Sequence, residues 1–119
     1  MTYSNELSER LFDFALLVLQ SFKQFQPSPE SFVLRKQLAR SATSVGANYE
    51  EAQSAVSKAD FKHKISICLK EIRETHYWLR LCDAACMAGP VSSLKPLIDE
   101  AHELKRILGA IAVKLDKAH

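Results

Sequence analysis

The most regular polar spacing in the chain lies between positions 40 and 51. Polar residues recur there at intervals of four, four and three, beside an apolar stripe of helical period formed by Leu38, Ala42, Val45, Tyr49 and Ala52. Such a polar stripe is either a solvated flank or a buried hydrogen-bonded seam. We expect a seam, within one subunit or between subunits, with two carboxylates from a later helix. Its expected members are Arg40, Ser44, Asn48, Glu51, Glu71 and Glu74.

Other arrangements do not meet the requirements of catalysis or metal binding. Asp99-x-x-His102 resembles the Glu-x-x-His motif that one helix of a di-iron carboxylate site provides. Such a site needs a second motif of this kind and two further inward glutamates. Cys82 and Cys86 are four residues apart, a spacing that suits core packing better than a Cys-x-x-Cys redox pair. The sequence therefore predicts a non-enzymatic protein with no catalytic residue, metal site or cofactor.

Basic side chains gather on the third expected helix. Residues 57–89 carry six basic and four acidic side chains. A basic excess favours phosphate groups because binding releases their counterions. An ordinary solvated face rich in lysine has the same composition, and this reading stays open. The expected nucleic-acid-binding residues are Arg35, Lys36, Lys58, Lys62, Lys64, Lys70 and Arg73.

The composition is that of one folded helical domain over residues 1–119. The chain is 47% hydrophobic and 25% charged, with only three Gly and four Pro, which favours helix over a many-turned β fold. Its net charge of +2 does not by itself indicate a nucleic-acid binder. No apolar run reaches the ~20 residues of a membrane span. The start lacks the basic segment of a signal peptide, and three cysteines form no disulfide framework, so we expect a cytoplasmic protein.

Helix start and stop signals divide the chain into four helices. Ser28 before Pro29 and Ser57 before Asp60 are typical N-terminal signals, and Gly89 followed by proline is a stop signal. The expected helices cover residues 4–25, 29–56, 58–87 and 93–117. Short connections make consecutive helices antiparallel neighbours. The predicted fold is therefore an all-α, antiparallel up-down-up-down four-helix bundle.

The first helix is apolar on two sides, which suggests burial on two sides. Besides its core stripe it carries Phe12, Leu16 and Leu19, which either contact a partner subunit or widen the core stripe. Trp78 and Leu81 lie on a similar secondary face of the third helix. We expect these five residues to form an oligomer interface. Within the second helix, Gly46 indicates either a close neighbouring helix or a bend.

Several blocks of the sequence resemble a known family. They are SVGANYEEA at 44–52, Asp60-Phe61, ISICLKE at 65–71 and ETHYWL at 74–79. These blocks are similar to the bacterial four-helix bundle family encoded in intervening sequences of 23S rRNA genes, in which Gly often stands where this chain has Ala52. The resemblance implies a left-handed bundle that assembles as a ring-like homopentamer. A related branch, the accessory variability determinant of diversity-generating retroelements, binds nucleic acid and works with a reverse transcriptase.

Two hypotheses of different classes follow from the sequence. The first is a non-enzymatic oligomeric scaffold that binds RNA or other nucleic acid through the third helix and the adjacent part of the second. The second is a protein-interaction module, without nucleic-acid binding, that uses the first helix and the Trp78 face. The resemblance implies partners among RNA, DNA, further copies of the chain and a reverse transcriptase.

Overall fold

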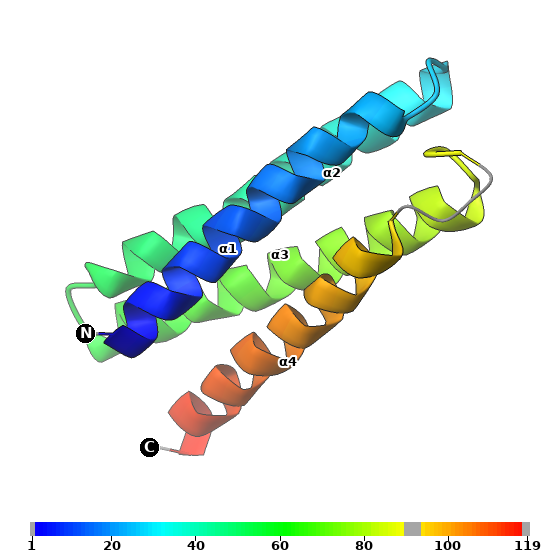
Figure 1. The fold of residues 1–119 in the computed structure, drawn as a ribbon. Coiled ribbons are helices and arrows are strands. Elements are labelled where there is room, and N and C mark those ends of the chain that lie inside the picture. The colour runs from blue at the N-terminus through cyan, green and yellow to red at the C-terminus, as the bar shows by residue number, and fades with distance from the viewer. Residues whose placement is uncertain (1, 90–93, 118–119) are drawn as a thin grey trace.

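Four long helices account for almost all of the described chain. The structure is a computed structural model that describes residues 2–89 and 94–117, with side chains placed for 6–89 and 94–117. Its helices are α1 (Thr2–Ser21), α2 (Pro29–Gln53), α3 (Lys58–Ala84) and α4 (Lys95–Lys117), with a short 3₁₀ turn, η1 (Phe22–Gln24), after α1. They run up, down, up and down in an elongated bundle of 47 × 24 × 21 Å (Figure 1). The predicted fold class is confirmed.

The core is built from the apolar stripes that the sequence periodicity indicates. One side of each helix faces the bundle axis, and the largest fully buried side chains are Leu11, Phe14, Leu38, Ile65, Ile72, Leu79, Leu94, Leu104 and Leu108. Among the four pairs of neighbouring helices, α2 and α3 make the most extensive contact and α1 and α4 the least. Across that last pair, the Arg10 guanidinium binds the Glu100 carboxylate through two hydrogen bonds of 2.7 and 2.8 Å.

Two helices begin at the caps that the sequence indicates. Ser28 Oγ accepts a hydrogen bond of 3.1 Å from the Ser31 amide, and Ser57 Oγ accepts one of 3.0 Å from the Asp60 amide. The Asp60 carboxylate accepts from the Val56 amide at 3.2 Å, one residue before the cap, so the capping box is completed one residue upstream. The expected start of the fourth helix at residue 93 lies outside the described residues.

The glycine inside α2 faces α1 at ordinary van der Waals distance. A Cβ built on Gly46 would lie 3.5 Å from Leu11 Cβ, and α2 continues through this position as one helix. Of the two expectations for Gly46, the close neighbouring helix is therefore the one that the structure bears out. The neighbouring helix is not so close that only glycine fits.

The helices end slightly earlier than expected. The first gives way to η1 after Ser21, and α2 ends at Gln53 rather than 56. The third ends at Ala84 rather than 87 because Cys86 adopts a left-handed φ of 55°. The Met87 amide then donates to the Cys82 carbonyl and the Cys86 amide to the Asp83 carbonyl, both at 3.0 Å, which is a Schellman motif. The Met87 carbonyl also accepts from the Gln26 amide at 2.8 Å.

Replacement of Cys86 by glycine is expected to stabilise the protein. A left-handed conformation costs an L-residue roughly 1–2 kcal/mol, whereas glycine adopts it freely but loses more backbone entropy on folding. We expect Cys86→Gly to raise the free energy of unfolding by up to about 1 kcal/mol, measured by urea denaturation. The matched control is Ala85→Gly, where φ is −84° and glycine should destabilise. Equal effects of the two variants would contradict this account of the helix end.

Candidate nucleic-acid interface

The predicted polar stripe joins α2 to α3 at its first residue. One Arg40 guanidinium nitrogen lies 3.2 Å from a Glu71 carboxylate oxygen, and the other nitrogen binds the Glu74 carboxylate. The Trp78 indole N–H donates to the same Glu74 oxygen at 3.3 Å. Glu71 is only 8% exposed, so Arg40 is what compensates a largely buried negative charge.

A second polar contact lies deeper between the same two helices. The Thr75 hydroxyl is 2.8 Å from the Ser41 hydroxyl and 2.8 Å from the Glu71 carbonyl oxygen, and both side chains are fully buried. Sequence reasoning placed Thr75 in the apolar stripe of the third helix and did not single out Ser41. The sequence signal for this contact is that each helix has a small hydroxyl residue within its apolar stripe.

The remaining members of the stripe do not extend this network. The Asn48 side-chain amide donates to the Ser44 carbonyl and hydroxyl oxygens, both at 2.9 Å, and so stays within α2. Glu51 pairs with Lys64 at 2.7 Å rather than with Arg40. The four stripe residues of α2 therefore belong to three separate interactions. Arg40 is in the cluster with α3, Ser44 and Asn48 contact each other, and Glu51 forms its own ion pair.

The predicted basic residues are spread over several surroundings. Lys64 is paired with Glu51, and Lys62 lies 2.9 Å from Asp116 of α4. Arg35 and Lys36 lie near the start of α2, each 5.9 Å from the centre of the Phe32 ring. Lys58, Lys70 and Arg73 are exposed on α3. These seven residues therefore do not form one continuous patch.

A tighter group of cationic and titratable side chains lies where α3 meets α4. The rings of His76 and His102 are 5.7 Å apart between their centroids. In an antiparallel helix pair, a step toward the C-terminus of α3 corresponds to an equal step toward the N-terminus of α4. The His76–His102 contact and the Lys62–Asp116 ion pair agree with one such alignment, and this alignment places Arg73 at the height of Lys105. We call Arg73, His76, Arg80, His102 and Lys105 the α3–α4 cationic face.

Lys105, Arg80 and His102 lie close enough to His76 to affect its charge. The pKa of His76 lies below its usual value, first because the ring is partly buried and then because Lys105, Arg80 and His102 are nearby. In the described part of the chain, no ion pair involves Arg73, Arg80 or Lys105. Sequence reasoning missed every member except Arg73, because helical periodicity does not reveal the register between two helices.

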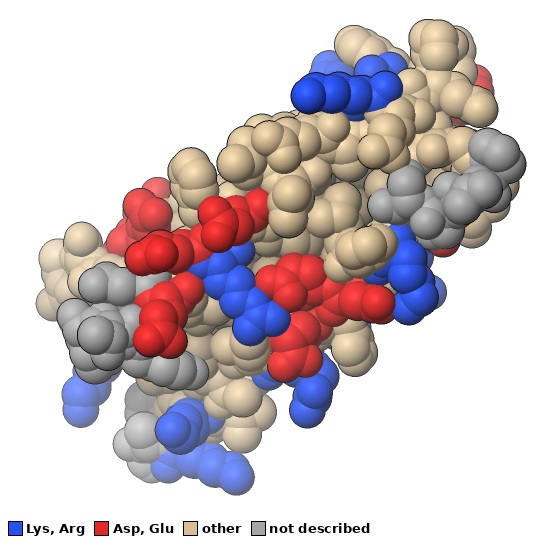
Figure 2. Space-filling model, in the orientation of Figure 1, with Lys and Arg blue, Asp and Glu red and all other residues tan. Residues whose placement is uncertain are grey.

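Acidic side chains gather elsewhere on the molecule. Figure 2 shows them over the N-terminal half of α1 and over α4, beside a broad uncharged area on the C-terminal half of α1. On α4, Asp99 pairs with Lys95 at 2.8 Å and Glu103 with Arg106 at 3.3 Å. Asp99 is therefore committed to a local ion pair, and His102 points instead to His76.

The two buried cysteines lack the chemistry of a reactive site. Burial raises the pKa of the Cys68 thiol to about 12 and that of the Cys82 thiol to about 11. Cys86 is exposed and unpaired with another cysteine. Among the described residues no three His, Cys, Asp or Glu side chains converge as a metal site would require, and no helix is both long and apolar enough to cross a membrane.

The residues expected at an oligomer interface lie mostly on the surface. Phe12 is 64% exposed and Leu16 44%, and Leu19 and Leu81 are exposed as well. Trp78 differs because it is partly buried against the core and touches the Tyr77 ring at 5.3 Å between centroids. The row on α1 is therefore separate from the core stripe and does not widen it.

The Arg40–Glu71 pair is expected to contribute more to stability than the exposed Lys64–Glu51 pair. Arg40→Gln leaves a largely buried carboxylate without its cation, which should lower the free energy of unfolding by about 1–3 kcal/mol in urea denaturation. Lys64→Gln is the matched control and should change stability little, because both partners of that ion pair are solvated. A larger loss in the control would contradict this ranking.

Comparison with known proteins places the chain in a family. The family model of the 23S rRNA-intervening sequence protein matches residues 4–110. A crystal structure of a protein with unknown function from the S23 ribosomal protein family of Bacteroides thetaiotaomicron is 32% identical, with a TM-score of 0.77 over 89% of this chain and 97% of that one. No curated protein matches. The expected relation to retroelement determinants stays a prediction. The chain belongs to the 23S rRNA-intervening sequence protein family.

Proposed function

We propose that the protein is a non-enzymatic, oligomeric scaffold that binds RNA, with the α3–α4 cationic face against the phosphate backbone. One observation carries this proposal: Arg80 and Lys105 lie close to His76 beside His102, Arg73 is level with Lys105, and none of these three cations makes an ion pair among the described residues. Uncompensated cations near one another attract phosphates and release their counterions on binding. The rRNA context of the family name favours RNA as the nucleic acid.

The dimensions of the face suit a nucleic-acid strand. Arg73 and Arg80 are seven residues apart, so about 10 Å separates them along α3 at ~1.5 Å per residue. Lys105 lies level with Arg73 on the neighbouring helix. The three cations therefore line a short track, along which more than one phosphate can bind. Repetition of the track in several copies of the chain would raise the avidity for a long RNA. The family resemblance predicts five copies.

Charge reversal on this face should weaken RNA binding without unfolding the bundle. Arg73→Glu combined with Lys105→Glu is expected to lower the affinity for labelled RNA at least about tenfold at low salt. The slope of log affinity against log salt should fall by about one for each lost phosphate contact. Titrations at several salt concentrations measure both quantities.

The control for this experiment is Lys23→Glu, which reverses an exposed lysine beyond the end of α1. It should retain the wild-type affinity. Equal losses in the control and the double variant would indicate nonspecific attraction rather than a site. Wild-type affinity that does not depend on salt would overturn the proposal.

Binding at this face should depend on pH through His76. Its lowered pKa means that the ring is neutral at pH 7, and a phosphate beside it would stabilise the protonated form. Binding then takes up a proton, so the affinity should rise as the pH falls from about 7.5 to about 5.5. His76→Gln should flatten this rise while retaining most of the affinity at pH 7.5. A rise that is unchanged in the variant would exclude this histidine as its source.

A protein-interaction module is the second candidate function. It is favoured by the exposed apolar row Phe12, Leu16 and Leu19 on α1, which the fold of one subunit leaves uncovered. A pull-down with and without nuclease distinguishes a direct protein partner, such as a reverse transcriptase, from one bridged by RNA.

Three unbridged cysteines are consistent with a reducing, cytoplasmic location.

A further inference from the structure

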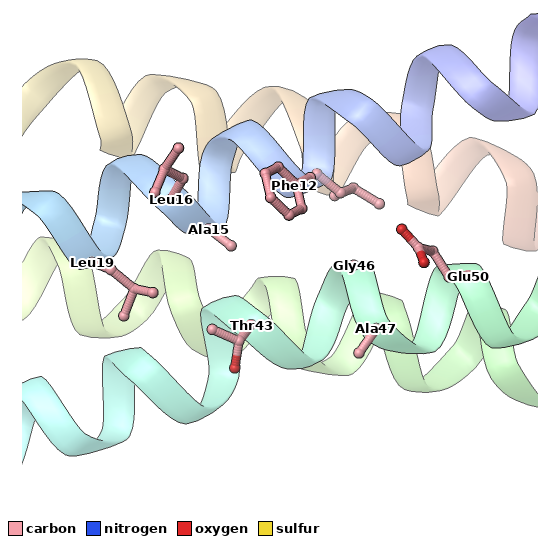
Figure 3. A pocket seen from close by; sticks show the side chains of 9 residues that line it. Phe12, Ala15, Leu16, Leu19, Thr43, Gly46, Ala47 and Glu50 are labelled. Carbon is pink, nitrogen blue, oxygen red and sulfur yellow. The ribbon is translucent and has the colours of Figure 1, made fainter.

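An apolar groove runs between α1 and α2 on the surface of the bundle. Its volume is about 340 Å³, and Phe12, Leu16 and Leu19 of α1 border it (Figure 3). Small residues form the facing side, among them Gly46 and Ala47 of α2. Large exposed apolar side chains beside a small-residue strip leave room for a ridge of side chains from another helix.

One end of this groove is acidic. Glu50 lines the groove, and Glu9 and Asp13 lie with Phe12 in the adjoining hollow. In the described part of the chain, none of these three carboxylates makes an ion pair. An occupant of the groove should therefore be apolar in the middle and basic at the end that meets these carboxylates.

The outward side of α3 carries a ridge of this kind. Lys70, Tyr77 and Leu81 are separated by seven and four residues, which sets them in one row along the helix. Tyr77 is 53% exposed and Leu81 39%, and Lys70 is exposed without an ion pair among the described residues. We call these three residues the α3 crest. The row lies outward of His76 and is distinct from the α3–α4 cationic face.

The crest and the groove match in register. Glu9 precedes Leu16 by seven residues on α1, and Lys70 precedes Tyr77 by seven residues on α3. The two helices run in the same direction within a subunit (Figure 1). A rotation about an axis along the bundle keeps that direction, so α1 of one copy and α3 of the next would lie parallel. Lys70 would then meet the acidic end while Tyr77 meets Leu16.

We propose that the groove between α1 and α2 receives the α3 crest of a second copy of the chain. This inference rests on the oligomeric part of the proposed function and adds the two surfaces that meet. Because the surfaces differ, the contact is head-to-tail, and every subunit offers a free groove and a free crest to its neighbours. Such contacts form a closed ring where the rotation closes. Of the residues expected at an interface, those on α1 would then face Leu81 of α3 across one contact, whereas Trp78 packs against the core of its own subunit.

Two single variants each remove one side of the contact. Leu16→Glu introduces a charge into the groove, and Tyr77→Glu introduces one into the crest. Both positions are solvent-exposed in a single subunit, so helical circular dichroism should be retained. Light scattering on a sizing column at micromolar concentration should give a multiple of the chain mass for the wild type. Each variant alone should give the mass of one chain.

A mixture of the two variants tests the head-to-tail geometry. Leu16→Glu keeps an intact crest, and Tyr77→Glu keeps an intact groove, so an equimolar mixture should form a species of two chains. It should grow no further, because its outer groove and outer crest are both disabled. The control is Phe32→Glu, an equally drastic change at an exposed residue outside both surfaces, which should keep the wild-type mass.

Several results would overturn the inference. They are a wild-type protein of one-chain mass, variants that keep the wild-type mass, and a mixture that stays at one-chain mass. Wild-type mass in Tyr77→Glu alone would indicate that groove meets groove, and a wild type of one-chain mass would indicate that a different protein fills the groove. All measurements are made without nucleic acid, so failure of RNA binding leaves them unaffected. Conversely, RNA titration of a one-chain variant tests the cationic face even if this contact is wrong.

Discussion

The structure depends on the compensation of one buried charge between α2 and α3. Glu71 lies at the most extensive helix contact of the bundle, and its carboxylate requires a cation because burial removes most of its hydration. Arg40 supplies that cation in the register and rotation that α3 has against α2. The Thr75–Ser41 contact, one turn along α3, is satisfied in the same arrangement. Polar groups therefore align two helices that apolar packing alone would hold less specifically.

Once the rotation of α3 is set, its other sides acquire their surroundings. Ile65, Ile72 and Leu79 point to the core, and His76 points to α4. Tyr77 then points away from the bundle. One helix thus provides a core stripe, a row of cations beside a second helix and an exposed apolar ridge. The functions proposed for α3 share a backbone but use different sides of it, so RNA contact and subunit contact need not compete.

The sequence predicts features that depend on local patterns and misses those that depend on how elements meet. Ser28 and Ser57 were identified as caps because capping involves residues three apart, and the core stripes followed from the helical period. The left-handed Cys86 was missed because this position usually holds glycine. The pairing of Glu51 with Lys64, and of His76 with His102, depends on helix rotation and register, which neither composition nor periodicity specifies.

The uneven contacts around the bundle also have a dynamic consequence. Helix α1 is held to α4 by the least extensive of the four contacts, and the partly solvated Arg10–Glu100 pair is prominent within it. Salt weakens such a pair, whereas the α2–α3 contact is largely buried and its charges are screened much less. Transient opening should therefore separate α1 from α4 before the central pair separates. Amide hydrogen exchange would be fastest along α1, and its rate there would rise with ionic strength.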